Sequence, residues 1–155
     1  MHILIATDAQ WVLNEIQAVF GSSSTTIQVV TNGRLVSPAV AERTPDIAIL
    51  DMQVGSMGGM AITMDLRLDH SSGALPNVPI LMLLDREADV HMARRSGANG
   101  WIIKPLDALR LRKAVNAIAA GGCYAEGVPV PEVVVEEVNA SVDEAAEPAA
   151  ELLNQ

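Results

Sequence analysis

The sequence contains little of several residue types, and each scarcity excludes a class of protein. Cys123 is the single cysteine among 155 residues, which rules out an intramolecular disulfide framework and a cysteine-based zinc cluster. The longest apolar runs, such as residues 47–50 and 80–84, are far shorter than the roughly 20 residues that cross a bilayer. No basic stretch precedes the first apolar run, so we expect no secretory signal and no membrane association, and a cytoplasmic protein.

Basic residues are missing from the last part of the chain. All ten Lys and Arg residues and eleven of the nineteen Asp and Glu residues lie in residues 1–121, so this part has a net charge of −1. Residues 122–155 account for the remaining −8 of the formal −9. This acidic segment is rich in Ala, Val and Pro and cannot bury enough apolar surface to offset its chain entropy. We therefore predict one domain over residues 1–121 and a largely disordered acidic tail over residues 122–155.

Short apolar runs alternate with amphipathic segments along residues 1–121, which is typical of βαβ units and a parallel sheet. The pattern predicts an α/β fold with a doubly wound, five-stranded parallel sheet, a flavodoxin-like (βα)5 sandwich. The strands are expected over residues 2–6, 26–30, 46–51, 79–84 and 100–103. The first helix is expected to begin near residue 9, and the others to cover residues 35–42, 59–68, 86–95 and 107–120.

Two further patterns concern the helices. Met57, Met60 and Met64 are spaced to share one side of the third helix, which predicts that they pack in the core. The arginine pairs, Arg94 with Arg95 and Arg110 with Arg112, are isolated and form no continuous basic face. Direct DNA binding is therefore not expected.

Charged residues stand at the carboxyl ends of the predicted strands, where ligands bind in such sheets. Asp8 follows the first strand, Asp51 ends the third, and Lys104 follows the fifth. The two carboxylates, with a backbone carbonyl and waters, would form the sparse all-oxygen site that Mg²⁺ prefers. There Asp51 is a candidate nucleophile toward phosphorus, and Lys104 would neutralise the phosphoryl oxygens. The alternative is that all three are ordinary polar residues at loop entrances.

Residues 1–121 resemble the receiver domain of bacterial two-component response regulators. The motifs that carry this resemblance are ILIATD at residues 3–8, PDIAILD at 45–51, MGG at 57–59, VPI at 78–80 and GANGWIIKP at 97–105. The resemblance implies that Asp51 accepts a phosphoryl group and that Lys104 contacts it. It also implies a Mg²⁺ site formed by Asp8, Asp51 and the main-chain carbonyl of Gln53.

Several positions depart from the family pattern. Thr7 stands where the family has a first acidic residue, so one metal carboxylate is missing and Mg²⁺ binding should be weak. Leu84 replaces the Thr or Ser whose hydroxyl binds the phosphoryl group, and Trp101 is the aromatic residue that usually follows that hydroxyl. Leucine has no hydrogen-bond donor to offer, so these two switch positions are degenerate and the usual switch should not operate. Gly55 and Gly58 replace the usual Pro and Asp after the third strand, which should soften that loop.

Two functions are compatible with this resemblance. The first is a stand-alone response regulator of a phosphorelay, phosphorylated by a sensor histidine kinase or a phosphotransfer protein. Because about 34 residues of acidic tail cannot form an effector domain, its output would be contact with a downstream protein. That contact would use the fourth helix, the fifth strand and the fifth helix, with Arg94, Arg95, Trp101 and Arg110. The sequence leaves open whether the chain also forms a homodimer.

The second function is a phosphorylation-independent pseudo-receiver, an adaptor or scaffold that kept the fold and lost the switch. Thr7 and Leu84 favour it, whereas the retained Asp8, Asp51 and Lys104 oppose it, because charged residues in a buried pocket are costly to keep. Neither function is enzymatic beyond self-phosphorylation and self-dephosphorylation at Asp51. A phosphatase of the haloacid dehalogenase type is disfavoured, since such enzymes place a second carboxylate where this chain has Gln53.

Overall fold

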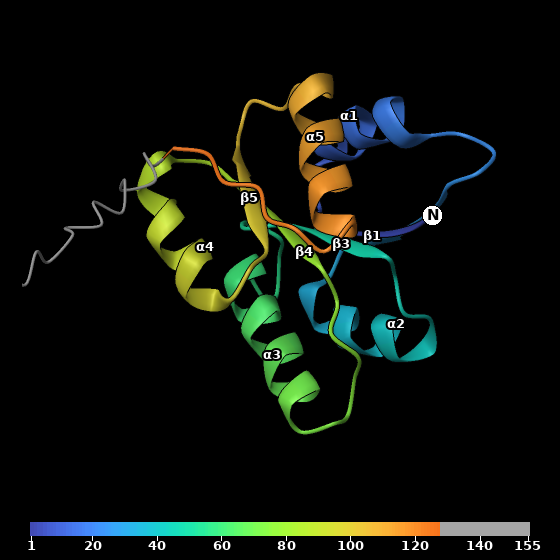
Figure 1. Ribbon diagram of the computed structural model, residues 1–155, viewed down its shortest axis with the longest axis vertical. Coiled ribbons are helices and arrows are strands. Elements are labelled where there is room, and N and C mark those ends of the chain that lie inside the picture. The colour runs from blue at the N-terminus through green and yellow to red at the C-terminus, as the bar shows by residue number, and fades with distance from the viewer. Residues whose placement is uncertain (128–155) are drawn as a thin grey trace, which may run out of the picture.

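Five parallel strands form a single sheet in the order β2-β1-β3-β4-β5 (Figure 1). The computed structural model describes residues 1–127, so most of the predicted acidic tail lies outside the described residues. The strands are β1 (His2–Ala6), β2 (Thr26–Val30), β3 (Ile47–Asp51), β4 (Ile80–Leu84) and β5 (Gly100–Ile103). The predicted fold class is confirmed, and the observed strands match the expected ones to within one residue.

Helices cover both faces of the sheet. On one face lie α1 (Gln10–Phe20) and α5 (Ala108–Ala119), and on the other lie α2 (Val36–Glu42), α3 (Gly59–Ser71) and α4 (Val90–Ser96) (Figure 1). The third helix continues past residue 68, into the stretch expected to be a loop. The fourth begins later than expected, because a 3₁₀ turn over Glu87–Asp89 precedes it. Within residues 1–127, no helix is both long and apolar enough to span a bilayer.

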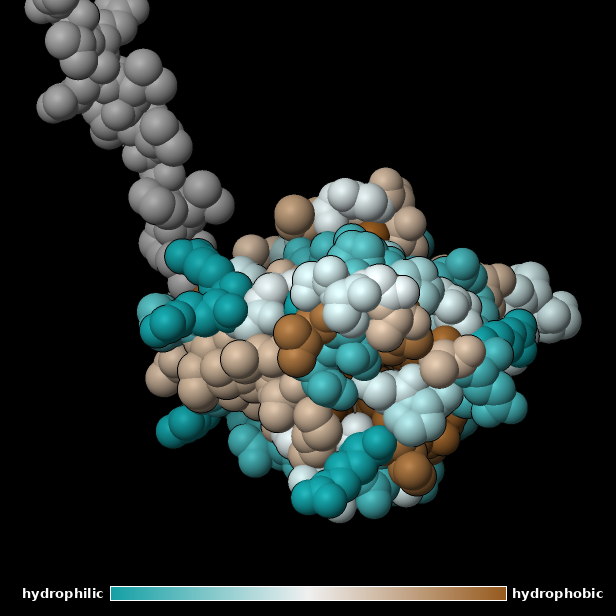
Figure 2. Space-filling model, turned by 90° about the horizontal axis from the view of Figure 1, so that it is seen from below, coloured by the Kyte–Doolittle hydropathy of each residue, from teal (hydrophilic) through white to brown (hydrophobic). Residues whose placement is uncertain are grey.

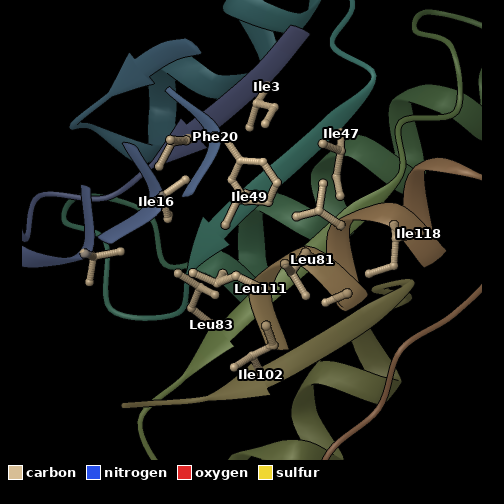
Figure 3. Packing of buried hydrophobic residues seen from close by; sticks show 14 residues of the cluster. Ile3, Ile16, Phe20, Ile47, Ile49, Leu81, Leu83, Ile102, Leu111 and Ile118 are labelled. Atoms are coloured by element: carbon tan, nitrogen blue, oxygen red, sulfur yellow. The ribbon is translucent and has the colours of Figure 1, made fainter. Parts of the chain in front are cut away.

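The central strands β1, β3 and β4 are buried along their whole length. Ile49 in β3 pairs with Ile5 on one side and Leu81 on the other, and Figure 3 shows this layer packed against side chains of α1 and α5. Burying each such side chain contributes about 1.5–3 kcal/mol to folding. The centre of the sheet is therefore a rigid base for the residues at its carboxyl edge.

The methionine prediction for the third helix is wrong at Met64, whose side chain is 52% exposed. The buried side of α3 is formed by Ile62, Thr63 and Leu66, which recur at the three- and four-residue spacing of a helix face. Thr63 is accommodated there because its hydroxyl donates to the carbonyl of Gly59 at 2.8 Å. Figure 2 shows apolar side chains mixed with hydrophilic ones on the side of the molecule where α3 lies.

The chain remains packed on the domain beyond residue 121, where the sequence placed the domain boundary. Tyr124 forms a parallel β-bridge with Gly100, the first residue of β5. Its ring packs against the core layer of α1 and α5. Residues 122–127, expected to belong to the tail, are therefore attached to the edge of the sheet.

Candidate functional site

Strand register brings the candidate residues together at the carboxyl edge of the sheet. Ala6 in β1 pairs with Leu50 in β3, so the residues that follow them, Thr7 and Asp51, are neighbours. Leu84 in β4 pairs with Ile103 in β5, which places Lys104 at the same edge. The strand order reverses beside β1 and β3, and such a reversal is where doubly wound sheets bind ligands.

The Asp51 carboxylate is 1% exposed, and both of its oxygens are hydrogen bonded. Oδ1 accepts from the Lys104 ammonium at 2.8 Å and from the Gln53 backbone N–H at 3.1 Å. Oδ2 accepts from the Thr7 hydroxyl at 2.9 Å. Buried charges are stable only when they are paired in this way. The Lys104 ammonium therefore balances the charge of the Asp51 carboxylate at the edge of the sheet.

The hydrogen bond from Thr7 to Asp51 was not predicted from the sequence, in which Thr7 stands only for a missing acidic residue. Its hydroxyl donates to Asp51 Oδ2 and also accepts from the Ala9 N–H at 3.1 Å. A signal was available, since adjacent parallel strands that pair Ala6 with Leu50 place the next two residues side by side. What the sequence could not supply was the strand register itself.

Lys104 bridges two carboxylates and faces an aromatic ring. Its Nζ lies 3.2 Å from Asp85 Oδ1, in addition to its contact with Asp51. It also lies 5.6 Å from the ring centre of Trp11, a cation–π distance. The half-exposed Trp11 side chain, in the first turn of α1, was absent from the predicted site. The only feature of the sequence that points to Trp11 as part of the site is its position three residues after Asp8.

Asp8 is at the same edge but is exposed to solvent. Its Oδ2 accepts from the Gly55 backbone N–H at 3.2 Å, and a Cβ on Gly55 would lie 3.1 Å from that oxygen. Glycine at position 55 thus lets the loop after β3 approach Asp8. Within residues 1–127, no group of three or more His, Cys, Asp or Glu side chains could hold a metal ion.

Leu84 and Trp101, the two positions predicted to be a degenerate switch, are buried in one apolar cluster. Leu84 is fully buried, and it packs in a cluster with Met82, Val90, Ala93 and Trp101. Trp101 is 6% exposed, and its indole N–H donates to the carbonyl of Glu126 at 2.8 Å. The Leu84 side chain offers no polar group to a ligand at this edge.

The residues expected to form a partner surface separate into two places. Arg94 lies over the ring of Trp101, 5.9 Å from its centre, and Arg110 pairs with Glu126. Arg95 instead lines a groove between α3 and α4, together with Met64 and Leu68. The surface over α4, β5 and α5 therefore includes Arg94, Trp101 and Arg110, but not Arg95.

The contact between Glu126 and Arg110 should depend on pH. Burial opposes ionisation of Glu126, but hydrogen bonds from Arg110, the Ile103 N–H and Tyr124 outweigh it, and the pKa of Glu126 lies below its ordinary value of 4.5. A lowered pKa means that the ionised carboxylate stabilises this contact fully above pH 4.5 and stops doing so as the pH falls through that pKa.

We expect the Trp101 indole N–H to be strongly protected from exchange, relative to its intrinsic rate, at about pH 6, and to lose this protection as the pH falls through the lowered pKa of Glu126. Proton NMR of the indole signals measures this exchange. Glu126→Gln removes the titrating group and is the control, in which the pH-dependent step should vanish. The other ionisable groups facing this region are Arg110, Tyr124 and Arg94, together with Glu87 and His91, which line the same hollow as Gly127. A step that persists in the variant would show that Glu126 is not its source.

Comparison with known proteins agrees with this geometry. Residues 3–116 match the family described as the response regulator receiver domain. Over 120 residues the chain is 28% identical to PilH of Pseudomonas aeruginosa, an alignment covering 77% of this chain and 98% of PilH. Over 119 residues it is 29% identical to the response regulator VraR of Staphylococcus aureus, covering 74% of this chain but 53% of VraR.

Solved structures share the same fold. The receiver domain of the sensor histidine kinase PA1611 from Pseudomonas aeruginosa superposes with a TM-score of 0.67 at 19% identity, over 77% of this chain and 97% of that domain. That domain was solved with a magnesium ion coordinated in its active site cleft. The chemotaxis response regulator CheY4 of Vibrio cholerae gives a TM-score of 0.66 at 19% identity, over 76% and 97% of the two chains. The chain thus belongs to the response regulator receiver domain family, a family of signalling modules of two-component systems.

Proposed function

We propose that this protein is a single-domain response regulator of a phosphorelay that accepts a phosphoryl group on Asp51 and signals by contact with another protein. The observation that carries the proposal is the buried Asp51 carboxylate at the sheet edge, held by the Lys104 ammonium at 2.8 Å. The likeness to PilH, which the chain spans over 98% of its length, supports the single-domain form. A sensor histidine kinase or a phosphotransfer protein would supply the phosphoryl group.

The hydrogen bonds at Asp51 indicate which oxygen reacts. Hydrogen bonds from a charged donor are roughly twice as strong as neutral ones, so Oδ1 stays with Lys104 while Oδ2 is released by rotation of the Thr7 hydroxyl. Oδ2 then attacks phosphorus and forms an acyl phosphate, while the bond from phosphorus to the donor nitrogen breaks and its electron pair stays on that nitrogen. Lys104 is already placed to neutralise charge on the phosphoryl oxygens.

The oxygen donors at this edge fit a sparse Mg²⁺ site. Mg²⁺ binds through one or two carboxylates and keeps several of its waters, and the chain offers Asp8, Asp51 and the main-chain carbonyl of Gln53. The exposed Asp8 leaves room for those waters. When bound, the ion would act as a Lewis acid toward the phosphoryl oxygens. We propose that its affinity is low, because Thr7 supplies a neutral hydroxyl in place of a third carboxylate.

A phosphorylation-independent adaptor is the second candidate, and specific observations favour it. Leu84 buries an apolar side chain where the family has a hydroxyl, and Thr7 already satisfies Asp51 Oδ2. Retention of Asp8, Asp51 and Lys104 would argue against an adaptor if the three side chains shared a buried pocket. Asp8 is exposed, so its retention without function costs little, and that argument holds only for the other two residues.

Titration with Mg²⁺ and then beryllofluoride, a mimic of the phosphoryl group, separates the two candidates. We expect amide NMR signals around Asp8, Asp51 and Lys104 to shift, first with the metal and further with beryllofluoride. The full chain is used, with Asp51→Asn as the matched variant, in which the beryllofluoride response should be lost entirely because the attacking carboxylate is gone.

Two outcomes would decide against the response regulator. Absence of any beryllofluoride shift at saturating Mg²⁺ would leave the adaptor as the function of this chain. Shifts that survive in the Asp51→Asn variant would show that the mimic binds elsewhere. Shifts that extend to Trp101 would establish in addition a conformational response that does not need a hydroxyl at position 84.

A further inference from the structure

The segment that follows α5 returns to the sheet and lies along its last strand. We call residues 122–127 the strap. Figure 1 shows it as the orange trace that leaves α5, passes beside β5 and reaches the beginning of α4. The Trp101 N–H donates to the carbonyl of Tyr124 at 2.9 Å, and the Tyr124 N–H donates to the carbonyl of Asn99 at 3.3 Å. The strap thus pairs with β5 in the way that an added strand does.

Glu126 is the polar anchor of the strap. Its Oε1 accepts from Arg110 Nε at 2.7 Å and from the Tyr124 hydroxyl at 3.0 Å. Its Oε2 accepts from the Ile103 N–H at 3.1 Å and from Arg110 Nη2. The Glu126 carbonyl also binds the indole N–H of Trp101. The surface over α4, β5 and α5 therefore holds an extended peptide by one carboxylate, one carbonyl and β-pairing.

We propose that this surface binds an extended, acidic segment of a partner protein, and that the strap is the intramolecular occupant that the partner segment displaces. Three donors define the chemistry of the partner: Arg110 takes a carboxylate in two-point contact, Trp101 takes a backbone carbonyl, and the edge of β5 takes an extended backbone. An aromatic residue two positions before the carboxylate would fill the place of Tyr124. This inference goes beyond the phosphorelay proposal and does not require that Asp51 be phosphorylated.

The contacts of the strap with the domain are of a kind that a partner segment can replace. It is six residues long, and Tyr124 is its only side chain that packs on the core. Its attachment depends mainly on exchangeable polar contacts, each of which contributes modestly in net terms. A tethered segment nevertheless competes at an effective concentration in the millimolar range. A partner therefore gains access when the strap is weakened, and an intact strap keeps the surface closed to weak binders.

Two glycines provide a matched pair of variants. A Cβ on Gly127 would lie 2.6 Å from Ile103 Cδ1, at a backbone φ of +79°. A Cβ on Gly121 would meet nothing within 4 Å, although its φ of +91° is equally left-handed. Gly127→Ala should therefore lift the end of the strap from β5. Gly121→Ala imposes the same kind of backbone strain without touching the strap contact.

The test measures binding of a capped synthetic peptide with the sequence of residues 122–127, carrying serine in place of Cys123. Binding to the full chain is followed by the NMR signal of the Trp101 indole N–H, assigned with Trp11→Phe. We expect the Glu126→Gln and Gly127→Ala variants to bind the peptide at least fivefold more tightly than the wild type and Gly121→Ala. A second peptide with glutamine at the position of Glu126 should bind none of them measurably.

Several results would overturn the proposal. Equal peptide affinity in all four proteins would show that the strap does not compete for the surface. Equal binding of the glutamine peptide would show that Arg110 does not select a carboxylate. No indole shift in any protein at about 10 mM peptide, which matches the effective concentration of a tethered segment, would show that the surface takes no such peptide from solution.

Discussion

Lys104→Met is expected to lower the free energy of unfolding by about 3 kcal/mol, because removing one partner of a buried ion pair leaves the other charge uncompensated. Asp51 is 1% exposed, so water compensates poorly for the lost ammonium. The Thr7 hydroxyl and the Gln53 N–H remain as its partners, and neither carries a charge. Urea denaturation followed by circular dichroism measures the effect.

Two further variants test whether the loss of stability comes from the ion pair between Asp51 and Lys104. The double variant Asp51→Asn with Lys104→Met should return to within about 1 kcal/mol of the wild type, since no unpaired charge stays buried. Asp85→Asn removes the other carboxylate that contacts Lys104 and should change the stability by less than about 1 kcal/mol, because Asp85 is solvent-exposed. If the double variant were as unstable as Lys104→Met alone, the loss would come from packing of the lysine chain instead.

Thr7→Asp is expected to tighten Mg²⁺ binding about tenfold, which corresponds to about 1.4 kcal/mol. The substitution adds a carboxylate at the position adjacent to Asp51, and the affinity of such sites rises with the number of charged ligands. Without the metal, the same change replaces a hydrogen bond of 2.9 Å by repulsion between like charges. The variant should therefore melt at a lower temperature than the wild type in chelator, and should gain more from added Mg²⁺.

Calorimetric titration and thermal melting measure both effects on one sample. Thr7→Val is the control, since it removes the hydroxyl and adds no charge, and it should leave Mg²⁺ affinity unchanged within about twofold. If Thr7→Asp bound Mg²⁺ no better than the wild type, the site at this edge would not use position 7. Weak Mg²⁺ binding would then have a cause other than the missing carboxylate at position 7.

The sequence alone determined the fold class and most of the residues at the carboxyl edge. Fully apolar runs such as residues 47–50 favour a strand buried on both faces, and the alternation with amphipathic segments favours a parallel sheet covered by helices. Since all parallel strands end at the same edge, the sequence predicted that Asp8, Asp51 and Lys104 lie at one edge of the sheet. That prediction needed the order of the elements along the chain and no side-chain geometry.

Only the tertiary structure decided how these side chains divide their contacts. The Thr7 hydroxyl meets Asp51 because of the register between β1 and β3, which depends on how the two strands pack between their helices. The exposure of Met64 depends on the rotation of α3 about its axis, which Ile62 and Leu66 fix through burial, and a shared spacing could not reveal it. The strap is the clearest case. Composition marks residues 122–127 as part of an acidic tail, whereas Arg110 and Trp101, distant in sequence, convert Glu126 into an anchor. Which side chains form a hydrogen bond depends on where they lie in space. A sequence pattern gives only the separation of two residues along the chain.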